Sequence, residues 1–337
     1  MSAANAASAP TQSAFGVVVD GVRGAVGRLG GFAIGLIIAL GIEMVIFATQ
    51  SPYFFEPANL TNIGRGMAIV GIVAVGATIV MISGGFDLSV GSVMAASGMT
   101  AAWAINAGAG LWGGVALALA LGLVAGLVNG AIVSYLHINP LIATLGTLGV
   151  VRGLAFVVSG GSEIVVSNDS FVALGTAEVL GIPISVIVML AAFIFVGWLM
   201  PRTRFGRYTY AIGSSARASK LSGVSVARWR LAFYGMAGTL AALGGLVTVA
   251  RVGSAQPTAN LGAELDVITA VILGGTSLAG GRGRLFGTFL GLLVIAVLNN
   301  GLVLIDVATY WQQVIKGLVL LAAVFADEVR RSRRKEG

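Results

Sequence analysis

Few side chains in this sequence could carry out chemistry, and those that could lie within or beside long apolar runs. Glu43 lies inside the first apolar run, and Asp87 follows the second. A carboxylate at membrane depth can couple transport to an ion or act as a general acid or base, but it often has a protein partner. We expect Asp87 chiefly to cap a helix. For Glu43 we expect pairing with Arg65 or Arg152, and a place along a solute path is the alternative.

The usual catalytic and metal-binding patterns are absent from the sequence. It contains no cysteine and one histidine, His137, which argues against thiolate chemistry and histidine metal sites. The glycine-rich stretch GGTSLAGGRGR, residues 274–284, lacks the G-x-x-x-x-G-K-[ST] spacing that holds nucleotide phosphates. We therefore expect no enzyme, no cofactor and no metal, and any ATP hydrolysis would belong to a separate partner subunit.

The composition places the chain among integral membrane proteins. Of its 337 residues, 57% are hydrophobic and only 10% are charged, against roughly 25% charged in soluble domains. Fifty glycines fit helices that approach each other closely in lipid. The net charge of +7 comes from cations in loops and near the C-terminus. Membrane topology and anionic lipid explain these cations better than a nucleic-acid partner does.

Apolar runs and loop charges predict an all-α polytopic protein with about ten transmembrane helices. Arg23 and Arg28 precede the first run, and five cations lie in residues 327–337. Because cations are retained on the cytoplasmic side, both termini are expected there. We expect a cytoplasmic tail at residues 1–28, a single transmembrane domain at 29–326 and a basic cytoplasmic tail at 327–337. One run, Leu265 to Gly275, is too short to span unless its helix begins at the outer surface.

The longest polar stretch is the basic segment, residues 201–230, PRTRFGRYTYAIGSSARASKLSGVSVARWR. It carries seven cations and no carboxylate, so it should face the cytoplasm. Ser214 can cap a short helix within it, and Gly223 can end that helix in a left-handed conformation. These start and stop signals favour a docking helix on the membrane surface. The alternative is an ordinary positively charged loop.

Two glycine-rich stretches share one pattern, I-x-G-G-x-x-L-x-x-G, at Ile82–Gly91 and at Ile272–Gly281. Adjacent glycines break helices, so we expect a sharp turn at each stretch. The repeat is also weak support for duplicated halves. The residues expected to form the turns are Gly84, Gly85, Asp87, Gly274, Gly275, Gly280 and Gly281.

A few polar and aromatic side chains in the apolar runs could touch a transported solute. Asn129 lies beside a stripe of small residues, Gly122, Gly126 and Gly130, which is typical of a helix-packing face. For its amide we favour a hydrogen bond to another helix over contact with a solute. The candidate path residues are Asn129, Asn299, Asn300, Trp311 and Gln312.

Four segments together resemble one known family. They are GGFDLSVGS at 84–92, NPLIATLGTLGVVRG at 139–153, GRYTYAIGSSARASKLSGV at 206–224 and ELDVITAVILGGTSLAGGRG at 264–283. In this order and spacing they resemble the membrane permease subunit of ribose-type sugar ATP-binding cassette importers, the group that includes ribose, xylose, rhamnose and autoinducer-2 permeases. The resemblance covers nearly all of the chain from the first crossing onward.

The resemblance implies a multi-pass protein of the bacterial inner membrane that imports a monosaccharide by alternating access. It implies a homodimer or pseudo-dimer of permeases, an ATP-binding cassette ATPase pair on the cytoplasmic side and a periplasmic sugar-binding protein outside. In this family a short cytoplasmic coupling helix fits a cleft on the ATPase, and the matching stretch is Gly213–Gly223. The coupling residues expected from this match are Ser214, Ala216, Arg217, Ala218, Lys220, Leu221 and Gly223.

Other functions stay open from the sequence. Related permeases carry nucleosides and branched-chain amino acids, so the solute could be a nucleoside or another small polar molecule. An ion-coupled secondary transporter would use Glu43, Asp87 or Lys316 as coupling groups. Uptake driven by an ion gradient without any ATPase partner would identify that class. A membrane enzyme is a third possibility, and the missing nucleophile and metal ligands argue against it.

Overall fold

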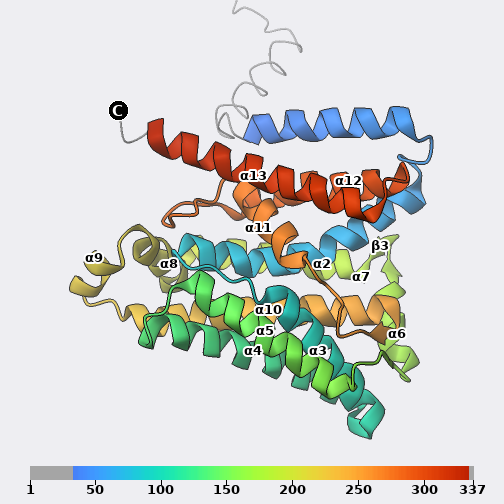
Figure 1. The fold of residues 1–337 in the computed structure, drawn as a ribbon, viewed down its shortest axis with the longest axis horizontal. Helices are drawn as coiled ribbons and strands as arrows, with labels where there is room; N and C mark the ends of the chain where they lie inside the picture. The colour runs from blue at the N-terminus through green and yellow to red at the C-terminus, as the bar shows by residue number, and fades with distance from the viewer. Residues whose placement is uncertain (1–32, 334–337) are drawn as a thin grey trace, which may run out of the picture.

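The computed structural model describes residues 33–333 of the chain. The expected cytoplasmic tail at 1–28 and both termini lie outside the described residues. The structure is predominantly helical (Figure 1). The first described helix is Ala33–Gln50. The remaining elements are α2 (Pro57–Ile82), α3 (Val90–Ala104), η1 (Ile105–Ala109), α4 (Gly110–Tyr135), α5 (Pro140–Ser159), β1 (Ile164–Val165), α6 (Asp169–Thr176), β2 (Glu178–Val179), β3 (Ile182–Pro183), α7 (Ile184–Arg202), α8 (Arg204–Ser214), α9 (Ala216–Leu221), α10 (Val226–Val252), β4 (Ser254–Ala255), α11 (Ala263–Leu273), α12 (Leu285–Leu304) and α13 (Thr309–Arg333).

Within residues 33–333, seven helical segments are long and apolar enough to cross a membrane, which defines a polytopic membrane protein. One of them, Val90–Tyr135, contains α3, the π-helical turn η1 and α4. The chain reverses at η1, where Gly108 and Gly110 have φ values of +93° and +69°. As a result Gly114 on α4 packs against the carbonyl of Ala101 on α3.

Helix α11 has 11 residues, fewer than the roughly 20 that a spanning helix needs. It is therefore not among the seven segments, and neither is α13. A total of ten crossings stays a prediction. Helix α13 continues through residue 326 without a break, so the boundary expected there does not coincide with a helix end.

Glycine contacts hold the centre of the helical bundle together. Helix α4 lies against α10, and a Cβ atom on Gly122 would overlap the carbonyl oxygen of Gly238. A Cβ atom on Gly126 would overlap the carbonyl oxygen of Tyr234, which is fully buried. Two helices can come this close only where both surfaces lack side chains. Lipid provides no hydrophobic drive for helix association, so close packing of this kind is what holds α4 against α10.

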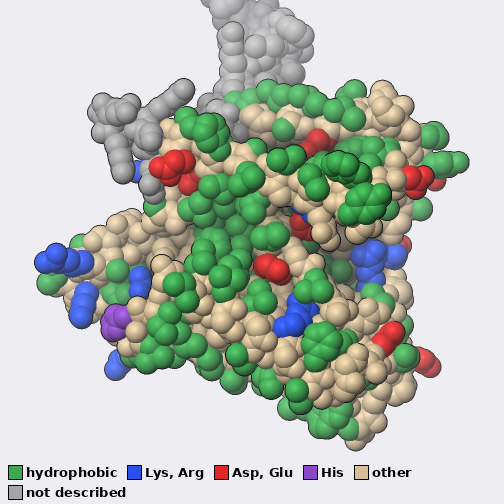
Figure 2. Space-filling model, viewed as in Figure 1, with side chains coloured by type: hydrophobic (Ala, Val, Ile, Leu, Met, Phe, Trp, Pro, Cys, Tyr) green, Lys and Arg blue, Asp and Glu red, His purple; other side chains and the backbone are tan. Residues whose placement is uncertain are grey.

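The two ends of the bundle differ in structure and charge. At one end lie α8 and α9, with exposed Lys and Arg side chains and the histidine (Figures 1 and 2). At the other end lie α6 and two short antiparallel ribbons, β1 with β4 and β2 with β3. The loop around α6 carries the exposed acids Glu163, Asp169 and Glu178. The retention of cations inside predicts that the end with α9 faces the cytoplasm.

Candidate functional site

Between the end of α7 and the start of α10, the basic segment contains two helices, α8 and α9, rather than one short helix. Helix α9 begins after Ser215, whose Oγ accepts a 3.1 Å hydrogen bond from the amide of Ala218. Ser214 is the last residue of α8. The expectation that Ser214 caps the docking helix is therefore wrong by one residue. Both adjacent serines can cap a helix, and the extended backbone that a cap requires is found at Ser215.

The far end of α9 is closed by Gly223. Its φ is +81°, and its amide donates a 3.1 Å hydrogen bond to the carbonyl of Lys220. This left-handed position favours glycine because a Cβ atom is strained there.

The side chains of α9 divide between solvent and protein. Leu221 is 82% exposed, and Arg217, Ala218 and Lys220 are exposed as well. Ala216 is partly buried and packs against the chain's own apolar core. The surface of α9 that faces solvent is thus one large apolar side chain flanked by two cations.

Helix α8 rests on two other segments at a glycine junction, which we define as Gly84, Gly213, Gly280 and Gly281. The amide of Gly281 donates a 2.8 Å hydrogen bond to the carbonyl of Ile82, at the end of α2. Gly213 lies on this contact, and a Cβ atom there would overlap the carbonyl oxygen of Ile82. A Cβ atom on Gly280 would come within 2.7 Å of the Cα of Gly84. The junction therefore joins α8, α2 and the loop after α11.

The turns that end α2 and α11 have the same geometry. After α2, Gly84 has a φ of +79° and donates to the carbonyl of Met81 at 3.0 Å. After α11, Gly275 has a φ of +84° and donates to the carbonyl of Ile272 at 2.8 Å. The shared sequence pattern aligns Gly84 with Gly274, one residue earlier. The pattern thus finds the right pair of turns with a register error of one residue.

Asp87 lies in a buried polar cluster between α2 and α3. Its Oδ1 accepts hydrogen bonds from the backbone amide of Ser89 at 2.9 Å and from the Ser89 hydroxyl at 2.6 Å. Asn129 on α4 donates to the same hydroxyl at 2.8 Å. Burial raises the pKa of Asp87, and the two hydrogen bonds that it accepts from Ser89 oppose the rise. The N-cap of α3 is Ser89, so Asp87 does not cap the helix itself but holds the capping residue in place. The amide nitrogen of Asn129 forms its hydrogen bond within the protein, to another segment, as favoured above.

The same loop is held by Tyr234 of α10. The hydroxyl of Tyr234 donates to the carbonyl of Phe86 at 3.0 Å, and the amide of Phe86 lies 3.2 Å from that hydroxyl oxygen. One side chain thereby satisfies both backbone groups of a residue that lies outside any helix. A buried backbone segment needs such partners.

The expected partners of Glu43 are engaged elsewhere. Arg65 forms a 2.9 Å ion pair with Glu178. Arg152 donates to two carbonyls in the loop after β4, at 2.7 and 2.8 Å. Within residues 33–333 no ion pair of Glu43 is found, and its Oε2 has no hydrogen-bond partner. The pairing expected for Glu43 is therefore wrong, because loops far away in sequence compete for both arginines.

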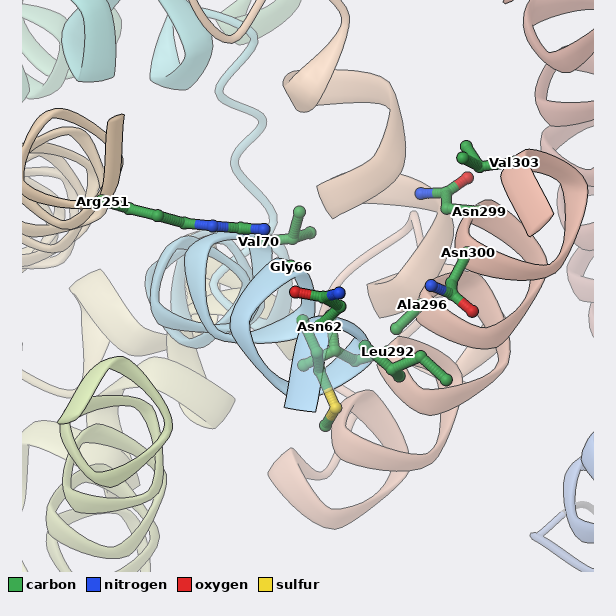
Figure 3. A pocket seen from close by; sticks show the side chains of 11 residues that line it. Asn62, Gly66, Val70, Arg251, Leu292, Ala296, Asn299, Asn300 and Val303 are labelled. Atoms are coloured by element: carbon green, nitrogen blue, oxygen red, sulfur yellow. The ribbon is translucent and has the colours of Figure 1, made fainter. Parts of the chain in front are cut away.

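Of the candidate path residues, Asn299 and Asn300 line a pocket between α2, α10 and α12 (Figure 3). Trp311 is exposed at the start of α13, and Gln312 donates to the carbonyl of Val307 at 2.7 Å. The two residues at the start of α13 are not among those that line the pocket.

Several residues at these sites were not anticipated from the sequence. The sequence indicates Gly213 only as the first residue of the docking stretch. Its place in the glycine junction depends on contacts with Ile82 and Gly281. Arg251 lines the same pocket as the two asparagines. A signal for Arg251 was present, since it is a single cation at the end of an otherwise apolar run. Lys316 forms a 2.9 Å ion pair with Asp266, which sequence spacing alone does not place nearby.

The fold and these sites define a class of protein: a multi-pass membrane permease, with a basic segment seated on the ends of its helices. The chain belongs to the family described as branched-chain amino acid transport system / permease component, whose sequence model matches residues 59–324.

Curated relatives match the chain over most of its length. The ribose import permease protein of Escherichia coli K12 is 42% identical over 299 residues, which cover 88% of this chain and 93% of the relative. The ribose import permease protein of Bacillus subtilis is 43% identical over 296 residues, covering 87% and 92%. The L-arabinose transport system permease protein of Escherichia coli K12 is 38% identical over 301 residues, covering 89% and 92%. No solved structure matches the chain.

Proposed function

We propose that the chain is the membrane-spanning subunit of an ATP-driven, binding-protein-dependent importer for a ribose-type monosaccharide in the bacterial inner membrane. The observation that carries the proposal is the 42% identity to a ribose import permease over about nine tenths of both chains. The family description names branched-chain amino acid transport, so family membership alone does not select a sugar. The ribose and L-arabinose permeases among the relatives favour a sugar as the solute.

The mechanism couples a partner ATPase to the membrane helices through α9. Leu221 enters an apolar cleft on the ATPase, and Arg217 and Lys220 meet its surface. Ser214, Ala216, Ala218 and Gly223 shape the segment that carries these side chains. When ATP binding closes the ATPase pair, the segment moves, and the glycine junction transmits that movement to the ends of α2 and α11. The open side of the path changes as a result.

The other partners follow from the same mechanism. ATP is hydrolysed by the separate ATPase subunits. Two permease copies form the path between them, and a periplasmic sugar-binding protein docks at the end that carries α6. The binding protein supplies most of the selectivity, so the permease itself needs only weak contacts with the sugar. Asn129, Trp311 and Gln312 remain candidates for such contacts, with structural roles as the alternative.

A secondary transporter is the second candidate function, and the ion pair of Lys316 with Asp266 is the observation that favours it. Charged side chains in membrane segments often mark ion-coupling sites. In this chain, however, Asp266 also accepts a 3.2 Å hydrogen bond from Asn299, so the ion pair also serves to join α11, α12 and α13. A nucleoside importer differs from the first proposal only in the solute.

The proposal is tested by co-purifying the tagged chain in mild detergent and identifying its partners by mass spectrometry. Recovery of an ATP-binding cassette ATPase, together with ATP-dependent uptake of a monosaccharide in reconstituted vesicles, is the expected result. Recovery of the intact chain alone, with gradient-driven uptake in vesicles that contain no ATP, would replace the importer by the secondary transporter.

A further inference from the structure

A cavity of about 410 Å³ lies between α2, the last turn of α10 and α12 (Figure 3). This volume falls within the roughly 300 to 1,000 Å³ of typical small-molecule sites. The cavity belongs to the half of the bundle opposite α9, because α2 contributes its first half and α12 its second half. The lining residues are Asn62, Ile63, Gly66, Met67, Val70, Arg251, Leu292, Ala296, Asn299, Asn300 and Val303.

Arg251 is the only charged residue among those that line the cavity. Its side chain extends from α10 toward α2 (Figure 3). Within residues 33–333 it makes no ion pair, and the charge that acts on it is a second cation, Arg65. Arg65 is already paired with Glu178. Among residues 33–333, the guanidinium of Arg251 is therefore not engaged by a carboxylate and can donate hydrogen bonds to a ligand in the cavity.

Asn299 and Asn300 reach the cavity from α12 with their orientations fixed. The Nδ2 of Asn299 donates to the carboxylate of Asp266 at 3.2 Å, and Lys316 holds that carboxylate at 2.9 Å. The Nδ2 of Asn300 donates at 2.9 Å to the side-chain oxygen of Asn59, which itself donates to a backbone carbonyl. Carboxylates and carbonyls can only accept, so these bonds determine which end of each amide faces its partner. Side chains locked in this way are preorganised for a ligand.

The rest of the cavity wall is aliphatic, with Ile63, Val70 and Leu292 among its members. A guanidinium and three amides next to aliphatic side chains suit a sugar. The hydroxyl groups can accept from Arg251 and exchange hydrogen bonds with the amides, while the carbon skeleton packs on the apolar wall. The nearby acid, Asp266, is occupied by Lys316 and Asn299, so the cavity offers no free carboxylate for a cationic solute.

We propose that this cavity is a subsite for a neutral polyhydroxyl solute in the outer half of the transport path, with Arg251 as its main hydrogen-bond donor. The inference rests on the proposed function and adds the location and chemistry of a solute contact. It predicts that Arg251, Asn62, Asn299 and Asn300 determine the permease's own affinity for the sugar.

The natural absence of cysteine allows a direct test in the full transport complex. Gly66 lines the cavity, and a Cβ atom there would meet no atom within 4 Å, so Gly66→Cys adds a thiol without a clash. The thiol is labelled from outside with a charged maleimide in right-side-out vesicles, with and without D-ribose. At a ribose concentration about ten times the dissociation constant, occupancy should slow labelling about tenfold.

Two matched thiols control for access and for indirect effects. Gly197→Cys lies on the lipid-facing side of α7, where its Cβ would also meet no atom, and should stay unlabelled. Ser162→Cys lies in the exposed outer loop and should be labelled equally fast with and without sugar. In the Gly66→Cys background, Arg251→Ala should abolish protection and Arg251→Lys should restore part of it.

The outcomes separate this inference from the proposed function. If the unmodified complex imports ribose but ribose never protects the thiol at Gly66→Cys, the subsite is wrong while the importer stands. If the anion D-gluconate protects better than ribose, a neutral solute is the wrong class. If no ATP-driven sugar uptake occurs and no ATPase co-purifies, the proposed function itself fails. Protection by ribose that is lost in Arg251→Ala supports the subsite.

Discussion

The amide nitrogen of Gly281 donates a 2.8 Å hydrogen bond to the carbonyl oxygen of Ile82. This bond joins the loop after α11 to the last turn of α2. Gly213 of α8 lies directly against the bonded pair. On the same face, the hydroxyl of Tyr210 donates to the carbonyl of Gly283 at 2.9 Å. A displacement of α8 therefore acts on two helix ends at once.

Gly213→Ala should disturb this junction. Its new Cβ would overlap the carbonyl oxygen of Ile82, so either the α8 backbone or the hydrogen bond must shift. Overpacking of this kind typically costs about 1–3 kcal/mol. We expect a lower unfolding temperature in detergent and a loss of ATP-driven uptake. Gly146→Ala on α5 is the control, since its Cβ would meet no atom. Equal behaviour of the two variants would contradict the junction.

Leu221→Asp should release the ATPase without unfolding the permease. Leu221 is 82% exposed, so the change removes no packing within the chain. The new charge would be placed where we propose an apolar cleft on the partner. Co-purification of the ATPase should fall sharply while the amount of permease in the membrane is unchanged. Leu180→Asp, at a leucine that is 97% exposed between β2 and β3, should keep the ATPase.

Gly223→Pro should leave the protein in the membrane but uncouple it. Proline fixes φ near −65° and lacks an amide hydrogen, whereas Gly223 has a φ of +81° and donates to Lys220. The end of α9 must then rearrange, and uptake should be lost. Gly223→Asn is the control because asparagine tolerates the left-handed region. If both variants transport at the parent rate, the shape of α9 has no role in coupling.

Asn129→Leu should destabilise the protein by about 0.5–1.5 kcal/mol, the usual net contribution of one hydrogen bond, because the Ser89 hydroxyl loses this donor but still donates to Asp87. Asn129 is 1% exposed and donates to the hydroxyl of Ser89. Unfolding of the single variants Asn129→Leu and Ser89→Ala, and of the double variant, gives a double-mutant cycle. A coupling free energy of about 0.5 kcal/mol or more is expected for residues in one network. Strict additivity would show that the two side chains act independently.

Lys316→Met should destabilise the protein, because the carboxylate of Asp266 would keep only Asn299 as a donor. The side chains of Lys316 and Asp266 are 31% and 12% exposed. The free energy of unfolding should therefore fall by about 1–3 kcal/mol, less than for a fully buried pair. The double variant with Asp266→Leu should recover part of the stability and should still need ATP for uptake. Gradient-driven uptake without ATP in the parent, lost in both variants, would instead favour ion coupling by this pair.

Composition and loop charge were sufficient to predict a polytopic helical membrane protein, and the four segments that resemble a known family added the permease function. Helix starts and stops were predicted where a local rule operates, as at Gly223, whose left-handed conformation depends on its neighbours in the chain. The error at Ser214 arose because two adjacent serines satisfy the same capping rule. The shared pattern aligns Gly84 with Gly274, although its counterpart in the second turn is Gly275, for a related reason, since the turn can use either of two adjacent glycines.

Contacts between distant segments could not be predicted from the sequence. Arg65 and Arg152 were candidate partners for Glu43, but the fold brings Glu178 and two loop carbonyls to them instead. The cavity depends on how α2, α10 and α12 pack, and α12 follows α2 by more than 200 residues. Asn299 and Asn300 were predicted as path candidates from their polarity alone, whereas the role of Arg251 required the packed structure.

The bonds between Phe86 and Tyr234 set a constraint on the order of synthesis. Tyr234 follows Phe86 by 148 residues. At about 5–20 residues per second, the ribosome reaches Tyr234 about 7–30 s after Phe86. During that interval the segment between α2 and α3 lacks the side chain that later satisfies the backbone of Phe86. The nascent chain must keep this segment hydrated, or shielded by the insertion machinery, until α10 is made.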